Sequence, residues 1–501
     1  FIVLGMAFGS DGIFKIPFDN FSIAEQVCSA ALIFIMFYGG FGLRWSEARP
    51  VAVRSVLLSS AGVVLTALFT GLFCHLALRM DFLEGLLLGA VLGSTDAASV
   101  FSILRSRRLN LKYGTASMLE LESGSNDPFA YMMTLILLSV MSGTADGGAI
   151  ALMLGKQLLF GILIGVALAL VAARFLSRFD FCGEGFDTIF VFAVALASYA
   201  LSGVLGGNGY LSTYLTGIIL GNRELKNQKA LVGFFDAFTG LMQMLLFFLL
   251  GLLAFPSQMP AILLPALAIA LFLTFIARPA AVGLLLAPFR PPLGQYLIVS
   301  WAGLRGAASI VFAIMATVSE SYMKYDIFHI VFCVVLFSIV FQGSLLPPLA
   351  ARCRMIDENG DVMRTFSDYT ADMQIQFVQL PIGADHPWAG KQISELSVLK
   401  GMLIALIRRG DETLAPRGST RIEAGDIVVL AAEGFADHQG TLLKEIPITP
   451  DHRWCGKKLS EAKFYKKTVV VMIRRGGQVL IPDGNTRMEA GDHAVVYSQQ
   501  G

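Results

Sequence analysis

The first 350 residues alternate between long apolar runs and short polar segments. A helix needs roughly 20 apolar residues to cross the hydrocarbon core of a bilayer. Eleven runs predict complete spans, near residues 23–42, 55–78, 85–104, 113–140, 157–173, 187–205, 210–221, 231–254, 261–287, 295–317 and 327–350. Residues 1–8 look like the end of a further span, since the chain opens on Phe1 within an apolar stretch. We therefore expect an all-α polytopic membrane domain over residues 1–352.

Basic residues in the short loops orient these spans, because Lys and Arg are enriched in cytoplasmic loops. One side carries thirteen: Arg44, Arg49, Arg54, Arg105, Arg107, Arg108, Lys112, Arg174, Arg178, Arg223, Lys226, Lys229 and Arg290. The other side carries four: Lys15, Arg79, Lys156 and Lys324. The richer side is predicted to be cytoplasmic. The chain leaves its last span on that side, so the C-terminal region is predicted to be cytoplasmic as well.

After residue 352 the pattern changes to mixed charge and short alternating runs, which is typical of a soluble α/β domain. This tail contains a repeat with an offset of 66 residues. HPWAGKQISEL is followed by HRWCGKKLSEA, and the EAGD at residues 423–426 recurs at residues 489–492. An ungapped match over about fifty positions indicates a duplication. We expect a linker at residues 353–372 and two modules, at 373–435 and 436–501.

Composition supports a membrane protein. Hydrophobic residues make up 55% of the chain and charged residues 15%, whereas soluble domains carry about 25% charged residues. The 38 basic and 37 acidic residues leave a net charge of +1, which predicts no nucleic-acid partner. The six cysteines form no C-x-x-C pair, which argues against a disulfide framework or a zinc site. No cofactor is expected.

Ionisable residues inside predicted spans are costly and are therefore functional candidates. Asp96 ends the segment Gly93-Ser94-Thr95-Asp96, a small polar break within an apolar span. The break predicts an unwound helix whose backbone carbonyls and helix ends face a cation. The alternative is an interruption for tight packing, with Asp96 as the cap of the second half. One residue can serve both purposes.

The next span carries ELESGSNDP, residues 120–128. Helical spacing places Glu120, Ser123 and Asp127 on one stripe and Glu122 and Asn126 on a second. Pro128 has no amide hydrogen, so it leaves a backbone carbonyl free beside Asp127. An acid, an amide and a hydroxyl within two turns suit an oxygen-rich ion site. The alternative is that Asp127 only pairs with a basic residue.

An internal similarity relates two distant spans. TDAASVF at residues 95–101 resembles RGAASIV at residues 305–311, and the span count places the two in opposite senses in the membrane. This pattern predicts an inverted repeat in which two interrupted helices cross near the bilayer midplane. Arg305 then needs an anion within the membrane, and Glu122 or Glu120 is its candidate partner. Arg278 is a further buried cation, and Asp236 is interpreted as an interfacial or gate residue.

With these motifs in view, the membrane part resembles the monovalent cation:proton antiporter superfamily, NhaP-type branch. The likeness rests on GSTDAASVF, ESGSNDP, GNR at residues 221–223 and SWAGLRGA at residues 300–307. The duplicated tail resembles the C-terminal module of RCK (regulator of potassium conductance) proteins, abbreviated RCK_C. The resemblance implies a dimer in which each chain has about thirteen spans, so one and a half spans are expected before Phe1.

The resemblance also assigns residue roles. It implies that Asp127 binds the monovalent cation or the proton, next to Asn126 as in the electroneutral branch. Thr95 and Asp96 would lie in the unwound helix and Ser123 would complete the site. A structural ion pair would join Glu122 to Arg305. The chain departs from many relatives at Tyr38, where they carry an acid.

The expected function is exchange of a monovalent cation, with K+ favoured, for H+ across the inner (plasma) membrane. A carboxylate that holds either a proton or a dehydrated cation predicts electroneutral one-for-one exchange. The alternatives are a Na+/H+ antiporter, a ligand-gated cation channel or a membrane-anchored sensor. Nothing resembles a TVGYG selectivity filter, and no GxGxxG fingerprint is present in the tail.

The tail's ligand is left open by the sequence. Relatives of this module bind nucleotides at a dimer cleft, so a regulatory nucleotide is a candidate partner. The basic residues that could reach its phosphates are Arg408, Arg409, Arg474 and Arg475. The alternative is that these arginines are solvated charges at hairpin turns.

Overall fold

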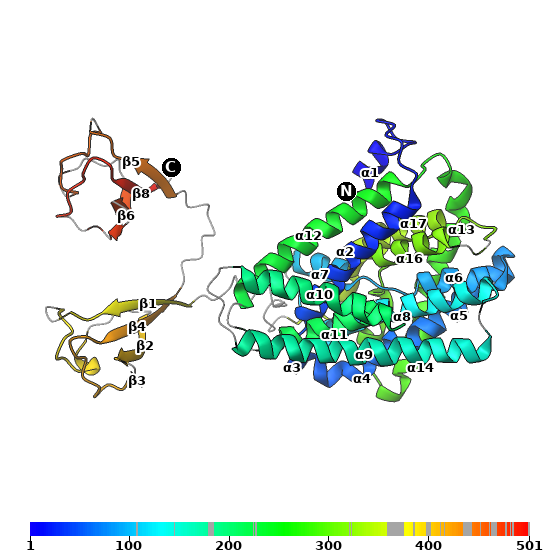
Figure 1. The fold of residues 1–501 in the computed structure, drawn as a ribbon, viewed down its shortest axis with the longest axis horizontal. Coiled ribbons are helices and arrows are strands. Elements are labelled where there is room, and N and C mark those ends of the chain that lie inside the picture. Colours follow the sequence, from blue (N-terminus) through cyan, green and yellow to red (C-terminus); the bar gives the residue numbers. More distant parts are fainter. Residues whose placement is uncertain are drawn as a thin grey trace. The chain divides into compact units, whose positions relative to one another are not determined.

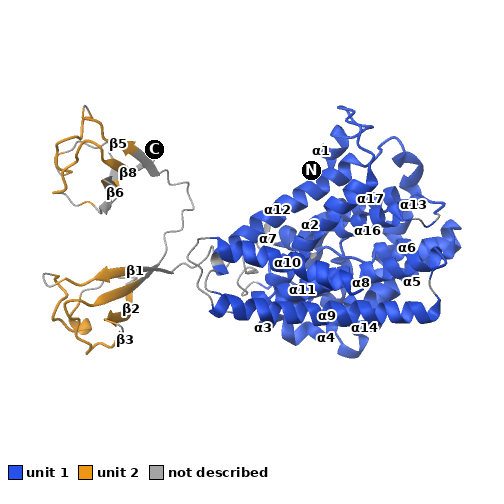
Figure 2. Cartoon of the chain, in the orientation of Figure 1, with its two compact units in different colours: residues 1–371 blue, residues 372–501 orange. Residues whose placement is uncertain are grey.

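A computed structural model divides the chain into two compact units, residues 1–371 and residues 372–501 (Figure 2). The structure describes residues 1–498 apart from 107–108, 145, 179–184, 224, 226–227, 320, 322, 358–374, 384–385, 397–401, 411, 415, 434–442, 451, 460, 462–467, 476–477, 481 and 483–484. Each unit is described by itself.

The first unit is built from helices (Figure 1). Its α-helices are α1 (Ile2–Phe8), α2 (Phe21–Phe41), α3 (Trp45–Ala48), α4 (Ala52–Ser59), α5 (Ala61–Leu78), α6 (Phe82–Val91), α7 (Ala97–Ser106), α8 (Thr115–Met141), α9 (Gly147–Arg178), α10 (Phe186–Val204), α11 (Gly209–Gly221), α12 (Gln228–Leu252), α13 (Met259–Phe272), α14 (Arg278–Leu286), α15 (Leu293–Trp301), α16 (Ala307–Val318), α17 (Ile327–Phe337) and α18 (Gly343–Arg352). Two 3-10 turns, η1 (Arg49–Val51) and η3 (Ala287–Phe289), and two π turns, η2 (Leu273–Ala277) and η4 (Ser338–Gln342), join neighbouring helices.

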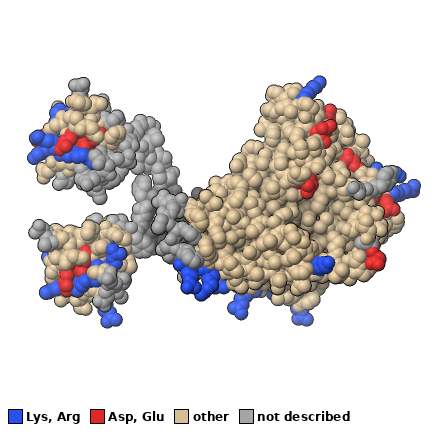
Figure 3. All heavy atoms as spheres, viewed as in Figure 1, with Lys and Arg blue, Asp and Glu red and all other residues tan. Residues whose placement is uncertain are grey.

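Every predicted span coincides with a helix or with a pair of helices. By length and composition, seven helical segments of the described chain can cross a membrane. Of the other four predicted spans, α6–α7 and α15–α16 are broken, α11 has only 13 residues, and α8 carries three carboxylates. Large apolar side chains such as Val64, Leu163 and Phe275 are exposed, and Figure 3 shows a broad expanse of this unit almost free of charge. Such a surface suits contact with lipid.

The two interrupted helices meet at their breaks, as predicted. Residues 92–96 separate α6 from α7, and residues 302–306 separate α15 from α16. The amide nitrogen of Asp96 donates to the carbonyl oxygen of Leu304 at 2.8 Å. A Cβ atom on Gly306 would lie 2.5 Å from the Cβ of Asp96. Only glycine therefore allows the two unwound segments to approach this closely.

Helices α2 and α11 also pack backbone against backbone. A Cβ atom at Gly217 would lie 2.2 Å from the carbonyl oxygen of Phe37, and one at Gly221 would lie 2.0 Å from that of Phe41. Small residues that let helices approach closely are typical of helix packing in membranes. This contact fixes α2, which forms one wall of the cavity described below.

The second unit holds two small antiparallel sheets of the same design. The first has the order β1-β4-β2-β3, from β1 (Ile375–Pro381), β2 (Met402–Arg409), β3 (Glu412–Leu414) and β4 (Ile427–Glu433). The second has the order β5-β8-β6-β7, from β5 (Leu443–Pro447), β6 (Thr468–Arg475), β7 (Gln478–Leu480) and β8 (His493–Ser498). Both sheets have a register shift at the same place, 404/406 and 470/472. The duplication read from the sequence is thus a duplication of structure.

Candidate functional site

The first break presents polar groups at the centre of the helical unit. Residues 92–96 are not helical, and Ser94 and Thr95 are 1% and 5% exposed. The Asp96 carboxylate accepts from the amide nitrogen of Ser99 at 3.1 Å and from its hydroxyl at 2.5 Å. Asp96 therefore caps α7, and it also lines the cavity described below.

Helix α8 docks its acidic segment on this break. The Ser94 hydroxyl donates to Oδ1 of Asp127. The Asn126 amide donates to Oγ1 of Thr95 and accepts from the Thr95 backbone nitrogen at 3.3 Å. The Ser123 hydroxyl donates to the Thr95 carbonyl oxygen at 2.6 Å. The structure thus brings together Thr95, Asp96, Ser123, Asn126 and Asp127; their role in ion binding stays a prediction.

The second break contributes Arg305, whose side chain is 1% exposed. Its guanidinium donates to the Ser94 carbonyl oxygen at 3.0 Å, and its backbone nitrogen donates to the Ser338 hydroxyl at 2.9 Å. Within the described residues, its Nε and Nη2 atoms have no hydrogen-bond partner. Arg305 therefore holds one unwound segment against the other.

The prediction that Glu122 pairs with Arg305 is wrong, because Glu122 forms its ion pair with Arg278. Oε1 of Glu122 lies 2.5 Å from Nη2 of Arg278, and the two side chains are 1% and 4% exposed. Arg278 begins α14 directly after the π turn η2. A π turn adds a residue to the helical repeat and changes the direction of the side chains after it. Spacing along the sequence does not reveal such a turn.

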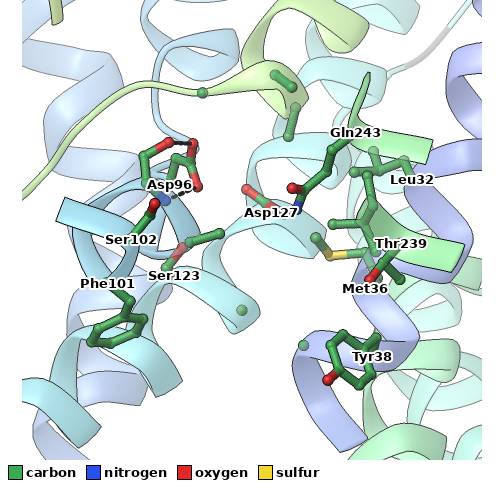
Figure 4. Close-up of a pocket in the computed structure, with 18 of the residues that line it drawn as sticks. Leu32, Met36, Tyr38, Asp96, Phe101, Ser102, Ser123, Asp127, Thr239 and Gln243 are labelled. Atoms are coloured by element: carbon green, nitrogen blue, oxygen red, sulfur yellow. Dashed lines mark hydrogen bonds between the residues drawn. The ribbon is translucent and has the colours of Figure 1, made fainter. Parts of the chain in front are cut away.

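A cavity of about 820 Å³ reaches this crossing. Its wall includes Thr95, Asp96, Ser123 and Asp127, and Figure 4 shows Asp127 between the broken helix and the side chains of α2 and α12. Glu120 also lines it, so the predicted stripe of Glu120, Ser123 and Asp127 faces one space. Asp127 is 5% exposed, so the carboxylate is buried although it lines the cavity.

Two further residues of this cavity form a pair across helices. The Tyr38 hydroxyl on α2 donates to Oδ1 of Asp236 on α12 at 3.0 Å. Both residues line the cavity. The position where many relatives were expected to carry an acid thus contacts an acid from another helix. Nothing in the sequence indicates that these two residues, 198 positions apart, are in contact.

In the tail, two of the four candidate arginines are engaged within their own module. Arg409 donates to Asp426 at 2.8 and 2.9 Å and to Glu423 at 2.7 Å. Arg475 repeats these contacts with Asp492 and Glu489. The guanidinium bonds hold the pKa of Asp426 and of Asp492 below the usual range. The prediction that Arg409 and Arg475 are available for a ligand is therefore wrong. Arg408 is exposed, and the side chain of Arg474 lies outside the described residues.

Sequence reasoning missed Ser94 and Arg278 as site residues. Ser94 was inside the break already singled out, so its hydroxyl could have been included on that signal alone. Arg278 was recognised as a buried cation, but nothing in the sequence chooses between it and Arg305 as the partner of Glu122.

Two interrupted helices that cross at a buried carboxylate, beside a cavity, are typical of a secondary transporter. The chain belongs to the sodium/hydrogen exchanger family: residues 1–352 match the transmembrane sodium/hydrogen exchangers. Residues 377–434 and 443–500 each match the TrkA-C domain. The predicted antiporter fold with two RCK_C-like modules is confirmed, and the protein is a transporter rather than an enzyme.

Similar proteins include the K(+)/H(+) antiporter NhaP of Alkalimonas amylolytica, 35% identical over 434 residues, which are 86% of this chain and 75% of the relative. The K(+)/H(+) antiporter NhaP2 of Shewanella baltica is 33% identical over 454 residues, 89% of this chain and 78% of the relative. The sodium proton antiporter MjNhaP1 of Methanocaldococcus jannaschii has a similar fold, with a TM-score of 0.61 and 24% identity over 68% of this chain and 91% of that structure.

Proposed function

We propose that this protein exchanges K+ for H+, one for one, and that Asp127 is the group that carries either load. The observation behind the proposal is the position of Asp127, which is buried at the crossing of two broken helices but lines a cavity. Potassium is favoured because the similar proteins at 33% and 35% identity are named K(+)/H(+) antiporters.

The charges at the crossing support the binding of either one monovalent cation or one proton at a time. Glu122 is paired with Arg278, whereas the Asp127 carboxylate accepts from the neutral Ser94 hydroxyl and has no basic partner among the described residues. A net charge inside a membrane is costly. One monovalent cation or one proton cancels the charge of the Asp127 carboxylate, and the two exclude each other there. Exchange of one for the other then moves no net charge.

We assign transport to residues 1–352 and regulation to the modules at 373–435 and 436–501, which a linker at 353–372 joins. The distribution of basic loops supports a cytoplasmic tail, and we assign the protein to the plasma membrane. A homodimer and a regulatory nucleotide complete the proposal. Because Arg409 and Arg475 are occupied by carboxylates, a nucleotide would use Arg408 and Arg474 together with backbone groups.

The test is proton flux in proteoliposomes containing the full chain. Addition of K+ is expected to release protons from loaded vesicles, as reported by a pH dye, and the release should survive clamping of the membrane potential at zero. Asp127→Asn should abolish it, while Asp19→Asn, at an exposed position, should exchange like the parent.

Each other outcome changes a different part of the proposal. Exchange retained in Asp127→Asn contradicts the site. A response to Na+ alone contradicts the potassium assignment, and a response that collapses under the clamp contradicts electroneutrality.

A further inference from the structure

Helix α2 carries one charged side chain, Glu25, in an otherwise uncharged segment of 21 residues. Glu25 is half-buried, and its Oε1 accepts from the Ser29 hydroxyl at 2.8 Å. Within the described part of the chain it forms no ion pair with a basic residue. A carboxylate at membrane depth is costly unless it has a use, and the site at Asp127 does not include it.

Glu25 lies on the face of α2 that lines the cavity. Leu32, Met36 and Gly39 belong to the cavity wall, and Figure 4 shows Leu32 and Met36 on the side of Asp127. Steps of three and four residues extend this face backwards to Ser29 and Glu25. At 1.5 Å per residue, Glu25 lies about 10 Å beyond Leu32 toward the external end of the helix.

A cluster of aromatic side chains begins one turn beyond Asp127. Tyr131 follows Asp127 by one turn on α8, and its ring lies 4.9 Å from that of Tyr210 and 5.9 Å from that of Phe312. Tyr199 lies 5.1 Å from Tyr210. We call these four residues the aromatic plug. None of them lines the cavity, and Tyr210 and Phe312 are 2% and 1% exposed.

The plug contacts the segment that holds Glu25. The Tyr210 hydroxyl donates to the Ser29 carbonyl oxygen at 3.5 Å. Glu25 is also within electrostatic range of Tyr131 and Tyr199. Loop charges place these groups in the external half of the unit, whereas Tyr38, Glu120 and Asp236 of the cavity lie in the cytoplasmic half. The plug therefore lies on the external side of Asp127, and these three cavity residues lie on its cytoplasmic side.

We propose that Glu25 is the residue that collects the cation on the external side, and that the aromatic plug is the barrier it must pass to reach Asp127. This inference rests on the proposed exchange of K+ for H+. A carboxylate at the mouth of a route raises the local concentration of cations. The plug must open for Glu25 and Asp127 to share one space, and Tyr131, one turn from Asp127, couples that opening to the site.

The test compares the two faces of the membrane. Exchange is measured in right-side-out vesicles with K+ varied outside, and in inside-out vesicles with K+ varied on the cytoplasmic face. Glu25→Gln should raise the external KM for K+ by about tenfold and leave the cytoplasmic KM within about twofold. Glu25→Asp should restore part of the external affinity. Asp19→Asn removes a nearby exposed external charge and should change neither KM.

A second variant covers a failure of Glu25→Gln to fold. Ser29→Ala keeps the carboxylate and removes the hydroxyl that orients it, so it should raise the external KM alone, by a smaller factor. Equal changes on both faces, or an unchanged external KM, would overturn the role of Glu25 while leaving the proposed function intact. A parent protein that exchanges K+ in neither kind of vesicle would overturn both.

Discussion

The ion pair between Glu122 and Arg278 gives the sharpest test of the crossing. Its atoms lie 2.5 Å apart, and both side chains are at most 4% exposed. At an effective dielectric constant of 20, two unit charges at that distance attract by about 7 kcal/mol. Part of this energy offsets the desolvation of both groups. Removal of one partner leaves a buried charge without compensation, which costs about 3–5 kcal/mol.

We therefore expect Glu122→Gln and Arg278→Gln each to destabilise the folded protein by about 3–5 kcal/mol. The double variant should lose much less than the sum, because it leaves neither charge unpaired. Arg305 donates to the Ser94 carbonyl instead of to Glu122. Glu122→Gln combined with Arg305→Gln should accordingly show a coupling of only about 1 kcal/mol.

The assay is thermal unfolding of the purified full chain in detergent. At about 2 °C per kcal/mol for a large domain, each single variant of the pair should lower the Tm by about 6–10 °C. The two double-mutant cycles then rank the couplings. A Glu122–Arg305 coupling as large as the Glu122–Arg278 coupling would refute the assignment of the pair.

Two further predictions concern helix packing and the tail. Gly217→Ala places a methyl group against the Phe37 carbonyl oxygen and should lower the free energy of unfolding by about 1–3 kcal/mol in the same assay. The control is Gly233→Ala on α12, where a Cβ atom would have no neighbour within 4 Å, and it should not change the free energy of unfolding. Equal losses of stability in the two variants would contradict the close contact of α2 and α11. Arg409→Gln should make the first tail module more sensitive to protease in the full chain at pH 7, because Asp426 is 1% exposed and loses its counter-charge. The folded pKa of Asp426 is lowered, so the stabilisation is present above about pH 4, the unfolded value, and is lost as pH falls through the folded value. The difference between parent and variant should therefore begin to narrow below about pH 4 and disappear below the folded pKa, and a difference that does not depend on pH would contradict this origin.

The sequence by itself determined the elements. Whether a segment crosses a bilayer depends mainly on the apolar surface of its own residues, so the predicted spans agree with helices from α2 to α18. The two breaks were equally local, since Gly93-Ser94-Thr95-Asp96 and Arg305-Gly306 interrupt apolar runs. The duplication of the tail was visible because each module repeats its turn residues at a fixed offset.

The tertiary structure decided which side chains meet. Two buried arginines, Arg278 and Arg305, were possible partners of Glu122, and the π turn before α14 directs Arg278 to it. Arg409 was read as a ligand candidate, but β4 places Asp426 within 2.8 Å of it. Tyr38 and Asp236 are 198 positions apart and hydrogen-bond only because α2 and α12 lie side by side. A helix's insertion depends on its own composition, whereas an ion pair, a closed plug or an open cavity depends on where two helices cross, which no single segment encodes.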